Sequence, residues 1–337
     1  MGNKISTNSR KGRFSTSKSV LKWKKQHKQP SSAESPPTPV PSCSQTTSIT
    51  SSQSSMNDSI VRQGRKFHNI TESIYWLPND DEEMDRLIGQ HFALKALFEG
   101  NIAKEALERV HLEEGAKILD VGCGPGTWLM DVATERPDCE LFGVDMCNVF
   151  PSDIRPPNVQ FMHGNVLERL PFDDNTFDFI NMRFLMLALR KDEWITALKE
   201  ILRVLKPGGC FQSLESGMMD RGNDFCLWVG KTFIDVMRSR GQEPYIAFTL
   251  ESIMKEAGFN FISSIQRDTY LDKPDPLNRE FLWDIRNIVK STQPFLAGPL
   301  GIPPDQYSKF LDKFEAECQK PPGAKWMIVI NVAQKEA

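Results

Sequence analysis

Residues 117–127 read KILDVGCGPGT, and this stretch decides the fold. The apolar run KILDVG (117–122) predicts a short strand, and WLMDVATE (128–135) predicts a helix that stops before Pro137. The glycines between them let the backbone turn sharply and let a ligand approach without meeting a Cβ. The N-terminus of the helix directs backbone amide donors toward that ligand. The stretch therefore predicts a strand–turn–helix unit with a ligand at its turn; a purely structural turn is the alternative.

Strands and helices continue to alternate beyond this unit. Further strands are predicted over residues 140–146, 159–165, 177–183 and 210–216, with a helix over 193–205. Toward the C-terminus, helices are predicted over 225–237, 250–257, 281–290 and 307–318, and strands over 259–270 and 325–333. Such alternation forms βαβ units in a doubly wound sheet. We expect an α/β fold with a Rossmann-like, seven-stranded, mostly parallel sheet whose last strand is antiparallel.

The chain divides into three predicted segments. Residues 1–66 form a basic and then Ser/Pro-rich arm that has too few apolar side chains to offset its conformational entropy, and we expect it to be disordered. Residues 67–112 form an N-terminal helical segment, and residues 113–337 form the α/β domain with C-terminal helical insertions. Within 67–112, a short helix is predicted over 102–110. A longer helix there is predicted to face the core through apolar residues at helical spacing, namely Met84, Leu87, Ile88, His91, Phe92, Leu94 and Leu97.

Charge and cysteine content narrow the class of protein. Nine of the 41 basic residues lie in the first 28 positions without an acid, which leaves 32 basic against 44 acidic residues, or −12, for the remainder. We therefore expect no nucleic-acid surface on the folded domain. The seven cysteines are scattered without a C-x-x-C pair, so we expect a reducing compartment and no structural metal. We also expect no membrane-spanning helix and no secretory signal.

The sign of one charge distinguishes two classes of ligand. The glycine spacing is G-x-G-x-G, and Thr127 stands where a dinucleotide fingerprint has its third glycine. Asp120 lies two residues before the first glycine, where a carboxylate would repel a pyrophosphate but attract the ammonium end of a methionine moiety. The sequence therefore favours S-adenosylmethionine over a nicotinamide dinucleotide, which stays as a weaker alternative.

Two polar residues follow the next strands. Asp145 closes the second strand, 19 residues after Gly126, and is placed to accept hydrogen bonds from ribose hydroxyls; a solvated loop acid is the alternative. Asn165 ends the third strand, where its amide would face the adenine amino group; a turn asparagine after Gly164 is the alternative.

These motifs resemble those of the class I S-adenosylmethionine-dependent methyltransferases. ILDVGCGPGTW looks like the first motif, GVDM the second, HGNVLERLPFDDNTFDFI the third and fourth, and LKEILRVLKPGG the approach to the fifth strand. The resemblance covers residues 116–216 and implies that S-adenosylmethionine is the cofactor. Asn165 departs from the family's usual Asp, which implies weaker or altered adenine recognition. The cofactor-binding residues that it implies here are Asp120, Gly122, Cys123, Gly124, Gly126, Asp145, Met146, Asn165 and Val166.

A narrower resemblance lies upstream of these motifs. YWLPND (75–80) with Glu83, Arg86, Leu87 and His91 is similar to the entry segment of fungal methyltransferases of the secondary-metabolism-regulator (LaeA-like) group. That resemblance implies that the segment folds over the cofactor, with Tyr75 and Arg86 closing the site. Ordinary core aromatics are the alternative for Tyr75 and Trp76, and we expect His91 to be a core histidine.

Methyl transfer from a sulfonium is an in-line displacement, and a general base helps only if the acceptor must lose a proton. The resemblance supplies no universal catalytic residue. The candidates are the polar residues near the ends of strands four and five, namely Asn181, Arg183 and Glu215. A local salt bridge is the alternative for Arg183, and a strand-end acid for Glu215; core positions are expected for Met182, Phe184, Met186 and Trp194.

The methyl acceptor is not predicted, and a small molecule, a lipid and a protein side chain all stay open. The alternative to an enzyme is a cofactor-binding regulatory or scaffold protein with this fold but little turnover.

The first residues, MGNKIS, match the myristoylation pattern at Gly2, and the basic residues that follow would add attraction to an anionic membrane. We expect a cytoplasmic protein that associates with membranes through this arm. A nuclear import patch, a mitochondrial transit peptide and a plain solvated tail are the alternatives.

Overall fold

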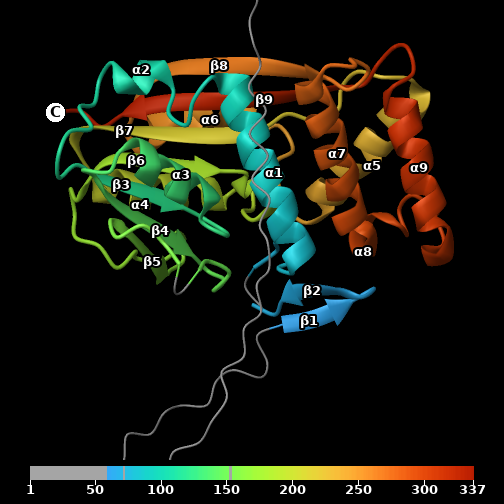
Figure 1. Ribbon diagram of the computed structural model, residues 1–337, viewed down its shortest axis with the longest axis horizontal. Helices are drawn as coiled ribbons and strands as arrows, with labels where there is room; N and C mark the ends of the chain where they lie inside the picture. The colour runs from blue at the N-terminus through green and yellow to red at the C-terminus, as the bar shows by residue number, and fades with distance from the viewer. Residues whose placement is uncertain (1–58, 71–72, 152–153) are drawn as a thin grey trace, which may run out of the picture. The chain divides into compact units, whose positions relative to one another are not determined.

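The computed structural model describes residues 59–70, 73–151 and 154–337. Gly2, the basic arm and most of the predicted disordered segment lie outside these residues. The described part contains a seven-stranded sheet flanked by helices, together with a small hairpin (Figure 1). No helix among the described residues is long and apolar enough to span a bilayer. No group of three or more His, Cys, Asp or Glu side chains in them is arranged to hold a metal ion.

The sheet has the strand order β5-β4-β3-β6-β7-β9-β8. All neighbours pair in parallel except β9, which runs antiparallel to both β7 and β8. The prediction of a mostly parallel sheet with an antiparallel last strand is therefore confirmed. The strands are β3 (Lys117–Val121), β4 (Glu140–Asp145), β5 (Val159–His163), β6 (Phe177–Arg183), β7 (Leu205–Ser216), β8 (Asn260–Tyr270) and β9 (Lys325–Gln334).

The strand order reverses its direction between β3 and β6. β4 and β5 lie on one side of β3, and β6 and β7 lie on the other. Right-handed crossovers consequently place helices α3 (Thr127–Glu135) and α4 (Glu193–Val204) on opposite faces of the sheet. Ligands of open α/β sheets bind outside the carboxyl ends of the strands at such a reversal. Asp120 on β3 pairs in register with Asn181 on β6 at this point.

The remaining helices pack around the sheet in two groups. α6 (Ile246–Ala257) packs on α4, β8 and β9. The helices α5 (Asp224–Ser239), α7 (Pro276–Ser291), α8 (Gln293–Leu296) and α9 (Tyr307–Cys318) gather together at one end of the sheet, at the right in Figure 1. α1 (Asp81–Phe98) contacts both α3 and α7, and therefore joins this helical group to the sheet.

α1 buries part of the predicted apolar face, through His91 and Leu94, and a polar stripe that the sequence does not predict. Ile88 is 39% exposed and Phe92 is 53% exposed, whereas Glu83, Arg86 and Gln90 are buried. The apolar periodicity is misleading because α7 supplies Asp284, whose carboxylate accepts hydrogen bonds from Arg86 and Gln90. A polar stripe at positions i, i+3 and i+7 is thus buried through contacts made across 200 residues of sequence.

Two further predictions about the N-terminal segment need correction. Residues 59–66, assigned to the disordered arm, belong to a hairpin of β1 (Ser59–Arg62) and β2 (Arg65–His68). Arg65 fixes this hairpin, because Nε and Nη2 donate to the Asp80 carboxylate at 2.6 and 2.7 Å. The helix predicted over 102–110 is reduced to α2 (Lys104–Leu107).

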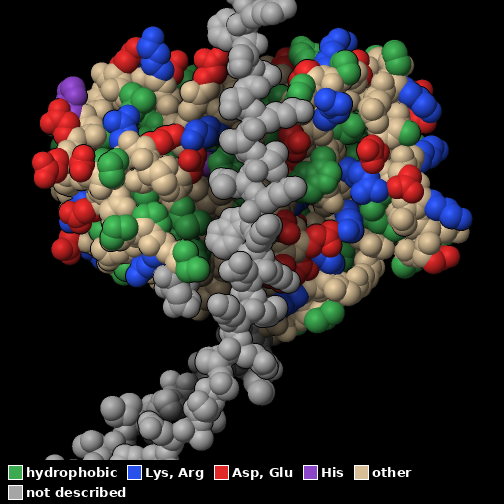
Figure 2. Space-filling view, in the orientation of Figure 1, with side chains coloured by type: hydrophobic (Ala, Val, Ile, Leu, Met, Phe, Trp, Pro, Cys, Tyr) green, Lys and Arg blue, Asp and Glu red, His purple; other side chains and the backbone are tan. Residues whose placement is uncertain are grey.

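Acidic and basic side chains are interspersed over the part of the surface that is in view in Figure 2. Several of them form surface pairs between neighbouring helices, such as Arg286 of α7 with Asp312 of α9 at 2.9 Å.

Candidate functional site

A pocket opens at the carboxyl ends of β3, β4 and β6. The glycine-rich turn forms its floor, and residues of the N-terminal segment between His68 and Gln90 form a second wall. Gly126 is absent from its lining because it packs under the turn against Phe161. The other turn and strand-end residues predicted to bind the cofactor all line the pocket, namely Asp120, Gly122, Cys123, Gly124, Asp145, Met146, Asn165 and Val166.

A relay of buried amides holds the Asp120 carboxylate at the mouth of the turn. Asn181 Nδ2 donates to Asp120 Oδ1 at 2.7 Å, and Gln212 Nε2 donates to Asn181 Oδ1 at 3.2 Å. The Gln212 carbonyl in turn accepts from the backbone N–H of Ala103 at 2.7 Å. Burial raises the pKa of Asp120 to about 6, against the attraction of Arg183 and the bond from Asn181. A buried carboxylate with one described partner retains free lone pairs for a cationic ligand.

Arg183 brings the opposite charge to the same pocket. Its guanidinium forms no ion pair within 4 Å among the described residues, so the local salt bridge considered from the sequence is not found. Its Nη1 donates a hydrogen bond to His91 Nδ1 at 3.4 Å. Burial and the charge of Arg183 lower the pKa of His91 to about 4, so this histidine is neutral and bonds through Nε2 to Asp131 at 3.0 Å. The pocket therefore presents the unpaired Arg183 cation together with the Asp120 carboxylate.

Asp145 and Asn165 already serve the backbone around them. Asp145 Oδ2 accepts from Gly124 N–H at 2.9 Å, and Oδ1 accepts from Cys147 N–H at 2.8 Å. The Asn165 carbonyl accepts from Leu167 N–H at 3.0 Å, and its amide donates to Glu168 at 3.3 Å. Asn165 therefore has the contacts of a turn asparagine, whereas the Asp145 carboxylate keeps lone pairs for ribose hydroxyls.

Comparison with known proteins gives the family. Residues 118–209 match the methyltransferase domain family. The chain is 30% identical over 259 residues to the N-methyltransferase verN of Clonostachys rogersoniana, covering 73% of this chain and 88% of that protein. This chain belongs to the class I S-adenosylmethionine-dependent methyltransferases. Its cofactor is S-adenosylmethionine, which sets aside the dinucleotide alternative.

Two other relatives illustrate the range of the methyltransferases that it resembles. Methyltransferase str3 of Strobilurus tenacellus is 28% identical over 207 residues, covering 60% of this chain and 72% of that protein. The secondary metabolism regulator LAE1 of Cochliobolus heterostrophus is 30% identical over 181 residues, covering 51% of this chain and 55% of that protein. The predicted resemblance to LaeA-like proteins is confirmed.

Two of the three candidate catalytic residues of this methyltransferase do not line the pocket. Asn181 is fully buried in the relay behind Asp120. Glu215 is also fully buried, and its two oxygens accept the N–H groups of Leu185 and Met186 at 2.9 and 3.2 Å. Burial raises the pKa of Glu215 to about 8 despite these two bonds. Its contacts are those of a helix cap, because they hold the turn after β6, and not those of a base that faces an acceptor.

A second cavity lies beside the first. The two cavities share four wall residues, namely Tyr75, Leu87, Gln90 and Phe184. Tyr75 thus contacts the cofactor pocket, as the LaeA-like resemblance implies, whereas Trp76 is a core residue whose Nε1 donates to Gln242 at 2.7 Å. Phe184 lines both cavities and is not the core residue that the sequence predicts.

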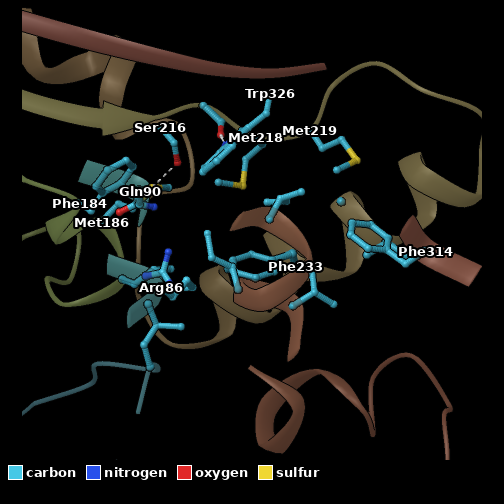
Figure 3. A pocket seen from close by; sticks show the side chains of 18 of the residues that line it. Arg86, Gln90, Phe184, Met186, Ser216, Met218, Met219, Phe233, Phe314 and Trp326 are labelled. Atoms are coloured by element: carbon cyan, nitrogen blue, oxygen red, sulfur yellow. Dashed lines mark hydrogen bonds between the residues drawn. The ribbon is translucent and has the colours of Figure 1, made fainter. Parts of the chain in front are cut away.

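Arg86 lines the second cavity and not the cofactor pocket (Figure 3). It pairs with Glu83 at 2.7 Å and with Asp284 at 2.5 Å, and all three side chains are buried. The prediction that Arg86 closes the cofactor site therefore places it in the wrong cavity. Its visible function in the structure is to join α1 to α7.

Sequence reasoning misses most of the second cavity. Its walls come from α1, the segment after β7, α5, α7 and α9, which no single motif connects. The burial of Gln90 had one indication in the sequence, because the spacing of Glu83, Arg86 and Gln90 puts all three on one face of α1. A polar stripe beside an apolar one would have indicated a second buried face.

Substitutions at two of the turn's glycines, Gly124 and Gly126, should lower the stability of the fold by different amounts. At Gly124 φ is +51°, and an added Cβ would enter open pocket space with Leu87 Cδ1 3.9 Å away. At Gly126 φ is +74°, and the Cβ would overlap the Phe161 ring. We expect Gly126→Ala to lower the free energy of unfolding by about 2 kcal/mol and Gly124→Ala by about 1 kcal/mol. Urea unfolding checks this order; equal losses would contradict it.

The protonation of Asp120 predicts a pH dependence of cofactor affinity. The group faces Arg183, Asp145 and the Asn181 amide, and its pKa in the free protein is about 6. An ammonium ligand requires the carboxylate to be charged, so affinity should fall as pH falls through 6, by about ten-fold between pH 7 and pH 5. Calorimetry with S-adenosylhomocysteine in two buffers should show proton release upon binding at pH 5.5. Affinity that is flat over this range would contradict the assignment.

Proposed function

We propose that this protein is an active methyltransferase that binds S-adenosylmethionine over the glycine turn and a small-molecule acceptor in the adjoining cavity. The observation that carries the proposal is the shared wall of the two cavities, formed by Tyr75, Leu87, Gln90 and Phe184. The shared side chains place the two cavities next to each other, so an acceptor in the second cavity would lie beside the bound cofactor.

The residues of the pocket fit the cofactor by charge and by shape. Asp120 suits the ammonium of the methionine end, and the unpaired guanidinium of Arg183 suits its carboxylate. Gly124 leaves room for close backbone approach, since a Cβ there would occupy pocket space. The carboxylate of Asp145, at the end of β4, suits the ribose hydroxyls. When bound, S-adenosylmethionine supplies an activated methyl group on a sulfonium.

The protein's contribution to the reaction is positioning. Described residues between His68 and Gln90 line the pocket opposite the glycine turn, and we expect them to limit the access of water to the bound cofactor. The carboxyl group of Glu215 fixes the backbone of Leu185 and Met186, and thereby the turn that carries Phe184 to the shared wall. Holding an acceptor in line beside the methyl carbon accounts for much of the acceleration such a reaction needs.

The alternative is a regulatory or scaffold protein that binds the cofactor without turnover, which the name of the relative LAE1 keeps in view. Calorimetry with S-adenosylhomocysteine tests binding. Release of S-adenosylhomocysteine from S-adenosylmethionine in a metabolite extract of the source cells tests turnover. We expect both; binding without any release above a boiled-protein control would support the regulator.

A further inference from the structure

The second cavity is polar at one end and apolar at the other. In Figure 3, Gln90, Phe184, Met186 and Ser216 lie at one end, and Phe314 and Met219 lie at the other. The end with Gln90 and Phe184 adjoins the cofactor pocket, since these two residues line both cavities. An occupant therefore meets Gln90 and Ser216, together with Phe184 and Met186, beside the cofactor pocket, and the apolar side chains of Met219 and Phe314 further away.

No unpaired charge lines this cavity among the described residues. Arg86 is its one ionised lining residue, and that guanidinium is neutralised by Glu83 and Asp284. Ser216 Oγ already contacts Met186 Sδ at 3.0 Å. A charged acceptor would lose its hydration in this cavity without gaining a counter-ion. Binding of a charged acceptor is therefore strongly disfavoured. The walls otherwise consist mostly of aliphatic, aromatic and methionine side chains, including Leu187, Met218, Val229, Phe233, Ile285 and Trp326.

Two polar atoms at the shared wall have no partner in the described part of the chain. Gln90 Nε2 donates to Asp284 Oδ2 at 2.9 Å, which leaves the Gln90 carbonyl oxygen as a free acceptor. The Tyr75 hydroxyl makes no hydrogen bond there, and burial raises its pKa, so it stays protonated and is a donor. Neither group is a strong base, and the Glu215 carboxyl on β7, which accepts the N–H groups of Leu185 and Met186, is absent from the lining.

We propose, on the basis of the function proposed above, that the acceptor is an uncharged, mostly apolar amine whose N–H donates to the Gln90 carbonyl. A neutral amine needs no base before transfer, unlike a hydroxyl. Its nitrogen lone pair forms the new N–C bond, and the electron pair of the broken S–C bond goes to sulfur, giving S-adenosylhomocysteine. The proton leaves the nitrogen for solvent afterwards. Gln90 is thus a specificity-determining residue.

A matched pair of fluorescent probes tests the charge and polarity of the occupant. N-phenyl-1-naphthylamine is a neutral apolar amine, and 1-anilinonaphthalene-8-sulfonate has the same skeleton with one negative charge. Both are titrated into the full chain saturated with S-adenosylhomocysteine, so that neither can enter the cofactor pocket. We expect the neutral probe to bind at least about ten-fold more tightly than the sulfonate. Equal affinities would overturn the proposal.

Two variants on α5 locate the bound probe. Val229 is buried in the cavity wall, and Val229→Phe would fill the space; Leu227 on the same helix is exposed, and Leu227→Phe is its control. We expect Val229→Phe to weaken binding of the neutral probe by about ten-fold and Leu227→Phe to leave it unchanged. Affinity for S-adenosylhomocysteine should stay constant in both, which also shows that each variant is folded. Val229→Phe with unchanged probe affinity would overturn the proposal.

A partition of the metabolite extract tests the acceptor class separately from the proposed function. The metabolite extract is partitioned between water at pH 7 and ethyl acetate, and each phase is assayed for S-adenosylhomocysteine release. Release with the organic phase supports an apolar, uncharged acceptor. Release with the aqueous phase alone overturns the acceptor class and leaves the methyltransferase assignment intact. Release with neither phase, with the neutral probe bound as expected, overturns the proposed function and, with it, the role of the occupant as an acceptor.

Discussion

Replacing Arg86 with methionine should lower the free energy of unfolding by about 4 kcal/mol, because it leaves the buried Asp284 without a counter-charge and the buried Glu83 with only Arg65, 3.9 Å away. Arg86, Glu83 and Asp284 are all almost fully buried, and the guanidinium contacts both carboxylates. Burial already raises the pKa of Glu83 and of Asp284, against the attraction of Arg86. Urea unfolding of the full chain measures the loss.

Arg286 on α7 provides a matched control. It pairs with Asp312 and Glu315, but these partners are exposed. Exposed pairs contribute little, so Arg286→Met should cost about 1 kcal/mol or less. Adding Glu83→Gln and Asp284→Asn to Arg86→Met should restore part of the stability, since no unpaired charge remains. Similar losses for the two single arginine variants would show that burial does not decide the effect.

Asp120→Asn should weaken binding of S-adenosylhomocysteine by about 100-fold, equivalent to about 2.7 kcal/mol, because the ligand's ammonium loses its buried anionic partner. Asparagine has nearly the same shape as aspartate and still accepts the hydrogen bond from Asn181, so the relay behind it is retained. Calorimetry at pH 7.5 measures the change.

The control for this variant is a smaller ligand. 5′-Methylthioadenosine has the adenosine and the sulfur but no ammonium or carboxylate, so its affinity should be the same for Asp120→Asn and the unchanged protein. A similar loss for both ligands would mean that the substitution disturbs the whole pocket, and no loss for either would refute the role of Asp120.

The parts of the fold that were predictable are those decided within short stretches of sequence. KILDV has a strand's apolar pattern, and the glycines after it have positive φ, as a tight turn requires. The negative charge at position 120 is read directly from the residue type. Its place near the end of a strand follows from the local apolar pattern. The sheet and the floor of the cofactor pocket follow from these local features.

The second cavity and the burial of α1 depend on contacts between distant segments. Nothing near Arg86 in the sequence indicates that Asp284 will face it, and the exposed Phe92 has the same apolar character as the buried Leu94. Glu215 was recognisable as a strand-end acid, but its role depends on where the N–H groups of Leu185 and Met186 are directed. The direction of a backbone N–H group is fixed by tertiary packing, and the spacing of residues in the sequence does not show it.

The buried carboxyl of Glu215 has a consequence for acid tolerance. Its pKa rises from 4.5 to about 8 on folding, so the folded chain takes up a proton that the unfolded chain lacks between these values. This group therefore favours the fold most in mild acid, and its contribution decreases as pH rises through that window. The Asp120 carboxyl loses its charge in the same mild acid. Mild acid should therefore lower cofactor affinity at a pH where the buried Glu215 carboxyl still favours the fold.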